Sequence, residues 1–123
     1  MAQSKKKIKR PKPLTYTKID NIVLKKWALK VKERDNWICQ VCKKDLRDNT
    51  RNCHAHHIIP KIIKETRYDI DNGITLCAYH HGGNPRLAAP YSPHQNALWF
   101  SNWLKYNKNT IYVKLMNILR NLP

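Results

Sequence analysis

Acidic residues are scarce in this chain. Eight Asp and Glu stand against 24 Lys and Arg, which gives a formal net charge of +16. So large a positive excess suits a polyanionic partner, because each neutralised phosphate releases condensed counterions. We expect nucleic acid as this partner. An acidic membrane surface is the alternative, and the apolar helical face that it would need is short: Leu24, Trp27, Ala28 and Val31.

Long apolar runs are also missing. No run approaches the roughly 20 residues of a membrane span, and no apolar stretch follows the N-terminal lysines. We therefore expect no membrane association and no secretory signal, but a cytoplasmic protein in a reducing compartment. In a reducing compartment the four cysteines are interpreted as metal ligands before disulfides. The length of 123 residues and the hydrophobic fraction of 41% predict one domain with a small core, which a bound metal would help to stabilise.

The first 18 residues, MAQSKKKIKRPKPLTYTK, combine seven basic residues with two prolines and no acidic residue. This composition predicts a disordered arm that lies on phosphates, with a solubilising tail as the alternative. The arm would bring these candidate DNA contacts: Lys5, Lys6, Lys7, Lys9 and Arg10. We expect residues 19–86 to form the functional domain and residues 87–123 to form a helical extension that packs on it.

The coarse pattern predicts helices at both ends of residues 19–123. Asp20 can cap a first helix that ends near 35–36, and its basic residues are candidates for phosphate contact. Ser92 followed by Pro93 has the form of a helix start, and a last helix follows residue 110. On that last helix a second apolar stripe could contact another subunit, although burial within one chain is the commoner cause: Tyr112, Leu115, Met116 and Leu119.

Between these helices the sequence predicts short strands and turns. One strand and turn would carry 39–42, a second strand would run from Cys53 to Ile59, and 71–73 is a turn signal. Two ligand pairs with tight spacing stand in this region, Cys39-x-x-Cys42 and Cys77-x-x-His80. Such pairs predict a closed, structural zinc site with four protein ligands. Cys53 could replace Cys77 as a ligand, but its strand pattern favours a buried thiol.

The stretch CHAHHIIP places three histidines and a cysteine within five residues. Adjacent strand residues point to opposite faces, so His56 and His57 would not serve one ion as equals. Hydrolysis of a phosphodiester needs both a base that works near pH 7 and a cation for the transition-state charge. Two neighbouring histidines could divide these tasks. Alternatively, they are surface residues of a strand with no role in chemistry.

Several blocks in order resemble the HNH endonucleases: WALKVKERDNWICQVC, then AHHIIP, YDIDNGITLC and HH, over roughly residues 25–84. The resemblance implies an α+β fold, the small ββα-metal unit, with a structural zinc beside the catalytic centre. It also implies a divalent metal on His56 and His81, with His57 as general base and Asn72 as the residue that pins the loop. The catalytic metal would be Mg²⁺, Mn²⁺, Ni²⁺ or Zn²⁺, although imidazole ligands soften the preference for magnesium and suit zinc, nickel, cobalt or manganese.

The chain departs from this family in three places. Many members have Asp where His56 stands, and the His-His version resembles the colicin-type nucleases. Relatives commonly have Cys-His where this chain has His80-His81, so His80 would bind zinc and His81 the catalytic metal. Relatives frequently have a further histidine four residues after the position of His81, where this chain has Pro85. Asn84 could supply an oxygen to the metal instead, but a turn at 82–85 is the simpler interpretation. His54 could support His56 or face solvent, and His94 is expected at the surface.

Two functions follow from these patterns. The first is a metal-dependent DNA endonuclease that nicks DNA or cuts both strands, with DNA favoured over RNA and a homodimer as one route to double-strand cleavage. Related small nucleases serve phages, restriction systems and mobile elements. The second is a zinc-stabilised DNA-binding module without catalysis, which would have no use for the ordered histidines.

Overall fold

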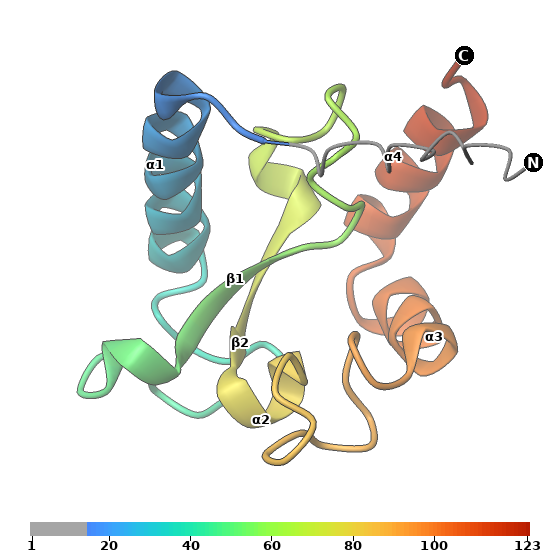
Figure 1. Ribbon diagram of the computed structural model, residues 1–123. Coiled ribbons are helices and arrows are strands. Elements are labelled where there is room, and N and C mark those ends of the chain that lie inside the picture. The colour runs from blue at the N-terminus through green and yellow to red at the C-terminus, as the bar shows by residue number, and fades with distance from the viewer. Residues whose placement is uncertain (1–14) are drawn as a thin grey trace, which may run out of the picture.

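A computed structural model describes residues 15–123 (Figure 1). The five predicted DNA contacts Lys5, Lys6, Lys7, Lys9 and Arg10 lie outside the described residues. The elements, in chain order, are α1 (Lys18–Arg34), η1 (Thr50–Asn52), β1 (Cys53–His57), η2 (Ile70–Asn72), β2 (Gly73–Cys77), α2 (Ala78–His81), α3 (Ala97–Asn107) and α4 (Asn109–Arg120).

The two strands form a small antiparallel sheet in the middle of the molecule. Their register pairs Cys53 with Cys77 at one end and His57 with Gly73 at the other. The turn expected at 39–42 is present, but the strand expected with it was wrong, since this region contributes a single bridge between Ile38 and Asp45. The partner of β1 is the segment GITLC, all five residues of which are buried. It was missed because its apolar run is short and follows a turn signal directly.

Helix α1 begins earlier than the sequence analysis suggested. Thr17 is the N-cap, and Asp20 closes a reciprocal capping box: the Thr17 amide donates to Asp20 Oδ2 at 3.0 Å, and the Asp20 amide donates to Thr17 Oγ1 at 3.0 Å. Asp20 is therefore the third residue of the first turn and not the cap. The helix ends at Arg34, as predicted, and its Asp35 carboxylate accepts from the Thr75 amide at 2.9 Å.

The start of α3 also differs from the expectation. Its N-cap is Asn96, whose side chain accepts from the Trp99 amide at 3.0 Å. Ser92 does not cap this helix; its buried hydroxyl donates to the Ala89 carbonyl at 2.7 Å. The serine and proline pattern marks a separate turn at 93–95, just before α3 begins at Ala97. Because of this shift, residues 92–95 belong to the loop after α2.

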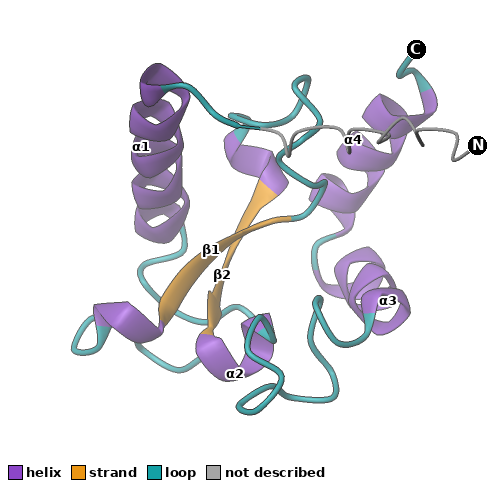
Figure 2. Ribbon diagram, in the orientation of Figure 1, coloured by secondary structure: helices purple, strands orange, loops and turns teal. Residues whose placement is uncertain are grey.

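The sheet is covered on two sides, with α1 on one side, α3 and α4 on the other, and α2 at one end (Figures 1 and 2). The buried cluster joins the cysteine region to α3, because Cys39, Cys53 and Cys77 share it with Phe100 and Leu104. The division into an arm (1–18), a nuclease domain (19–86) and an extension (87–123) remains a proposal.

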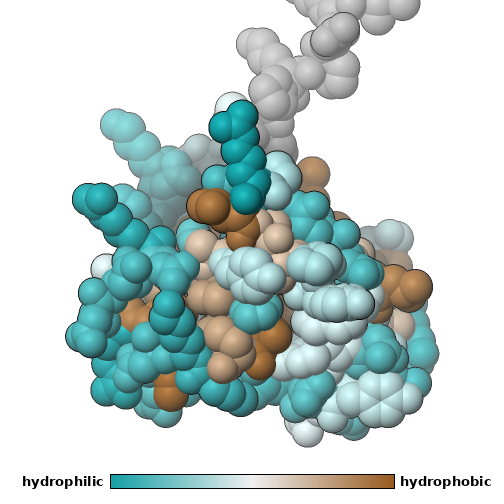
Figure 3. Space-filling view, turned by 90° about the horizontal axis from the view of Figure 1, so that it is seen from below, coloured by the Kyte–Doolittle hydropathy of each residue, from teal (hydrophilic) through white to brown (hydrophobic). Residues whose placement is uncertain are grey.

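Most of the second apolar stripe of α4 faces the interior of the chain. Leu115 is buried, Tyr112 packs against the core, and Met116 helps line an apolar cavity beside Phe100. Leu119, the last residue of the stripe, is 42% exposed. Packing within the chain accounts for the first three residues, and residues 15–123 give no support for a homodimer. Seen from the side of α2, hydrophilic residues surround a few hydrophobic ones (Figure 3).

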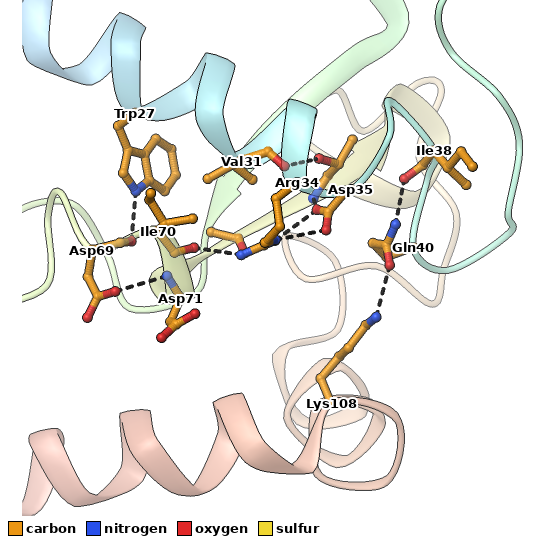
Figure 4. Close-up of polar contacts among 12 residues, drawn as sticks. Trp27, Val31, Arg34, Asp35, Ile38, Gln40, Asp69, Ile70, Asp71 and Lys108 are labelled. Carbon is orange, nitrogen blue, oxygen red and sulfur yellow. Dashed lines mark hydrogen bonds and ion pairs between the residues drawn. The ribbon is translucent and has the colours of Figure 1, made fainter.

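Polar contacts tie the end of α1 to the sheet (Figure 4). The Arg34 guanidinium donates to the carbonyls of Ile70 and Gly73, each at 2.7 Å, and pairs with Asp35 at 2.9 Å. The Lys108 ammonium, between α3 and α4, donates to Gln40 Oε1 at 2.9 Å. Among the helices of the described part, none has the length and apolarity that a membrane span would require.

Candidate metal centres and active site

The four predicted zinc ligands come together at the end of the sheet. The ligand atoms of Cys39, Cys42, Cys77 and His80 all lie within 4.8 Å of one another. The Cys42 and Cys77 sulfurs are 3.9 Å apart, and His80 Nδ1 lies 3.3 Å from the Cys77 sulfur. Ligands about 2.3 Å from a tetrahedral zinc are about 3.8 Å apart, so this donor set fits a closed Cys₃His site.

Two local structures hold these ligands. In the turn after Cys39 the Lys43 amide donates to the Cys39 carbonyl at 2.8 Å, and Lys43 adopts a positive φ of 66°. Cys77 ends β2 and is at once the N-cap of α2, which places His80 one turn away. Burial raises the pKa of the Cys77 thiol to about 12, so this sulfur keeps its proton at neutral pH unless a cation displaces it.

Cys53 lies beside this group without belonging to it. Its side chain is buried, it forms no disulfide, and burial raises the pKa of its thiol. The ligand group contains Cys77 and not Cys53. This position agrees with the interpretation of Cys53 as a buried thiol of the core.

A second group of donors forms from three histidines of different segments. The ring nitrogens of His56, His81 and His94 lie within 4.8 Å of one another, and the Nε2 atoms of His81 and His94 are 3.1 Å apart. His56 projects from β1, His81 ends α2, and His94 comes from the loop before α3. Three imidazoles at this spacing fit a divalent transition metal with open positions.

The sequence analysis missed His94 as a member of this group. It is exposed, as expected, but its ring meets His81. The loop that carries His94 can approach α2 closely because residue 82 is a glycine. Gly82 has a φ of 75°, and a Cβ there would lie 2.1 Å from Ser92 Oγ. Gln95 Nε2 also donates to the Gly82 carbonyl at 2.8 Å. A usable signal existed, since His94 is the one histidine after His81.

Burial keeps the first two of these imidazoles neutral. Burial, with smaller contributions from the nearby His81, His94 and His57, lowers the pKa of His56 to about 3. Burial likewise lowers the pKa of His81 to about 4, with smaller contributions from His94 and His54. A neutral imidazole offers the lone pair that a metal needs, so both rings are ready to bind an ion without first losing a proton.

His57 faces the opposite side of β1, toward α1. Its ring stacks on Trp27 with 3.7 Å between centroids and 12° between planes. Its Nε2 lies 2.9 Å from the Arg67 carbonyl oxygen. A carbonyl only accepts, so Nε2 carries the proton and Nδ1 of the neutral ring has the free lone pair. The two neighbouring histidines therefore lie on opposite faces of β1 and contact different residues.

One cavity is lined by both His57 and the three-histidine group. His57, His56, His81 and His94 all line a cavity of about 490 Å³, together with Lys61 at its rim. A phosphate in this space would meet a candidate metal site, a candidate base and a lysine. That combination is what hydrolysis of a phosphodiester requires.

Asn72 is fully buried and clamps the loop that follows β1. Its Oδ1 accepts from the Ile59 amide at 2.6 Å, and its Nδ2 donates to the carbonyls of Ile59 at 3.0 Å and Thr66 at 3.1 Å. These contacts hold the end of β1 against the loop that supplies the Arg67 carbonyl. They agree with the pinning role that the resemblance implied.

The remaining candidates take minor positions. His54 stacks on His81 with 4.9 Å between centroids, on the same face of β1 as His56. Asn84 is exposed, and its Oδ1 accepts from the Arg86 amide at 3.1 Å, as in a turn. His54 does not belong to the ligand groups, and the Asn84 oxygen is engaged in this turn.

Residues 39–84 match the family described as HNH endonuclease. The match covers both zinc pairs, His56, His57 and His81, but not His94 or Trp27. It indicates a nuclease-type or DNA-related function with a nucleic acid as substrate. Comparison with curated proteins gave no match, and comparison with solved structures gave none either.

Proposed function

We propose, from the HNH endonuclease domain that residues 39–84 form, that this protein is a metal-dependent endonuclease that hydrolyses phosphodiester bonds of DNA. Cys39, Cys42, Cys77 and His80 hold a structural zinc. A catalytic dication, bound by His56, His81 and His94, supplies positive charge to the scissile phosphate and the leaving oxygen. The excess of positive charge over the whole chain favours a polyanionic substrate.

His57 is the general base in this proposal. Its Nδ1 lone pair accepts a proton from the attacking water, while the Arg67 carbonyl takes the hydrogen bond from Nε2 and stabilises the imidazolium that results. Asn72 fixes the loop and thereby the position of that carbonyl. Lys61, at the rim of the cavity, is placed to contact a phosphate oxygen of the DNA.

The observation that carries the proposal is the shared cavity of His57 and the three-histidine group. A zinc-stabilised binding module needs the Cys₃His site and the basic charge, but it has no need for a second donor group beside an oriented imidazole. The spacing of the three imidazole donors and the fixed tautomer of His57 favour the enzyme.

The test starts from protein stripped of metal and reloaded with one equivalent of zinc. Supercoiled plasmid is then added with Mg²⁺, Mn²⁺, Ni²⁺ or further Zn²⁺ in turn, and the nicked and linear products are measured. We expect cleavage with at least one metal, and a roughly 10²–10⁴-fold lower rate for His57→Ala. Asn84→Ala, which changes a residue outside the ligand groups, is the matched control and should cleave like the wild type.

The outcomes separate the two candidate functions. Cleavage by wild type together with a roughly 10²–10⁴-fold lower rate in His57→Ala and retained DNA binding supports the nuclease with His57 as base. Wild-type rates in purified His57→Ala would refute the assignment of the base. DNA binding without cleavage under any metal would instead favour the binding module.

A further inference from the structure

Trp27, which lies outside the segment matched to the HNH family, contacts His57 directly. Its indole belongs to α1, is 4% exposed and stacks on the imidazole, nearly parallel to it. Its Nε1 donates to the Asp69 carbonyl at 2.8 Å (Figure 4). The indole therefore touches both the ring of the proposed base and the loop opposite that ring.

The sheet leaves room for this stack. Gly73 pairs with His57 across the two strands, and a Cβ at Gly73 would lie 2.6 Å from Trp27 Cζ2 and 2.4 Å from Val31 Cγ2. Both distances are too short for real atoms, so any side chain at this position would displace the indole. Because Gly73 has no side chain, Trp27 of α1 can contact the imidazole of His57 on the opposite strand.

The imidazole is held by two independent contacts. The Arg67 carbonyl fixes its Nε2 edge at 2.9 Å, and the indole fixes the plane of the ring. Asp69 and Arg67 belong to the same loop, so the indole N–H also steadies the backbone that supplies the carbonyl. A residue that served only to fill the core would need neither the parallel stack nor the bond to this loop.

We propose that Trp27 is a positioning residue for His57: it holds the plane of the imidazole so that Nδ1 stays directed at the attacking water. This inference rests on the proposed role of His57 as the base. It predicts that a change at Trp27 acts through His57 and not through zinc, DNA affinity or global stability.

The test compares Trp27→Leu, Trp27→Phe and Val31→Ala by single-turnover cleavage of plasmid at saturating protein. Val31 is fully buried on the same side of α1 and serves as the control for lost packing. We expect Trp27→Leu to cleave roughly 10–100-fold more slowly, because a small misplacement of a catalytic group costs about that much. Trp27→Phe keeps a ring that can stack and should recover most of the rate. Val31→Ala should cleave like the wild type at temperatures where it is folded.

A double-mutant cycle then identifies the route of the effect. In a His57→Ala background, Trp27→Leu should cause no further loss, since there is no base left to position. Zinc content and DNA affinity should stay at wild-type values in each variant. If Trp27→Leu does not fold, Trp27→Met, which fills more of the space without a planar ring, takes its place.

Equal rates for Trp27→Leu and Val31→Ala would overturn the proposal, as would an undiminished effect of Trp27→Leu in the His57→Ala background. These failures differ from failure of the proposed function. In that case the wild type would not cleave with any metal, or His57→Ala itself would cleave at the wild-type rate.

Discussion

His57 combines a buried imidazole with a hydrogen bond that fixes its tautomer. Burial lowers the pKa of His57 below the ordinary 6.5; the bond to the Arg67 carbonyl opposes this shift, and the charges of Lys61 and Arg67 add to it. A general base works only in its neutral form. We therefore expect the cleavage rate to rise with pH through one step below pH 6.5 and to stay level above it, as measured by single-turnover kinetics.

Ionisation of metal-bound water could give a similar step, so the pH profile needs a control. The step of a metal-bound water moves when Mg²⁺ is exchanged for Ni²⁺, whereas a step that belongs to His57 stays nearly in place. The step should also be missing from the residual activity of His57→Ala. A wild-type step well above pH 7 would contradict the assignment.

His94 makes a second prediction at the same scale. His94→Ala removes one of three metal donors but leaves His57 untouched, so its cleavage defect should shrink as the concentration of the catalytic metal is raised. We expect the apparent metal affinity to fall at least 10-fold, since even the loss of an outer partner of a ligand costs 10–100-fold. His54→Ala removes a histidine that contacts His81 without being a ligand, and its metal affinity should fall much less.

The histidines also show what sequence can and cannot predict about a site. The pair His56-His57 could be assigned to opposite faces from strand alternation alone, and the contacts agree. The contact of His81 with His94 could not be predicted in this way, because it depends on the close packing of Gly82 against Ser92 in the loop between them. The stack of Trp27 on His57 joins residues 30 positions apart, and no local pattern encodes such a contact.

At the scale of elements, the Cys₃His group joins the turn after Cys39 to the junction of β2 and α2. Structural zinc contributes folding free energy directly, and two of the ligands, Cys39 and Cys77, are buried residues of the core. We expect Cys39→Ser and Cys77→Ser to lose the zinc, the near-ultraviolet circular dichroism and, with them, cleavage. Elemental analysis and dichroism measure the first two.

Cys53→Ser is the matched control for this prediction. Cys53 is a buried cysteine of the same cluster, but it lies outside the ligand group. This variant should keep one zinc per chain and its dichroism, with a modest loss of stability. A folded Cys77→Ser protein with no zinc would show that the metal is not needed for folding.

Element boundaries were less predictable than element types. The helices at both ends were expected, yet α1 begins two residues before Asp20, and α3 begins after Asn96 and not after Ser92. Both errors have one cause: several residues near a helix start can accept from a backbone amide, and the neighbouring chain decides which one does. Strand β2 was missed because a fully buried strand shows no alternation.

At the scale of the whole molecule, the excess of positive charge predicts how binding depends on salt. Residues 1–14 contain six basic residues and no acidic one. A truncation should stop at residue 14, because Thr17 is needed as the cap of α1. We expect the truncated protein to bind every DNA sequence more weakly and with a shallower salt dependence. If all six charges contact phosphates, the slope of log K against log salt concentration should change by about 5.

The truncation needs a control that separates charge from length. A full-length variant with Gln at those six basic positions should lose the same part of the salt slope as the truncation, because counterion release depends on the number of neutralised phosphates. The ratio of affinities for different DNA sequences should be unchanged in both proteins, since phosphate contacts carry no sequence information. An unchanged salt slope would assign the electrostatic binding to residues 15–123, with the basic side chains of α1 and Lys61 as the next positions to substitute.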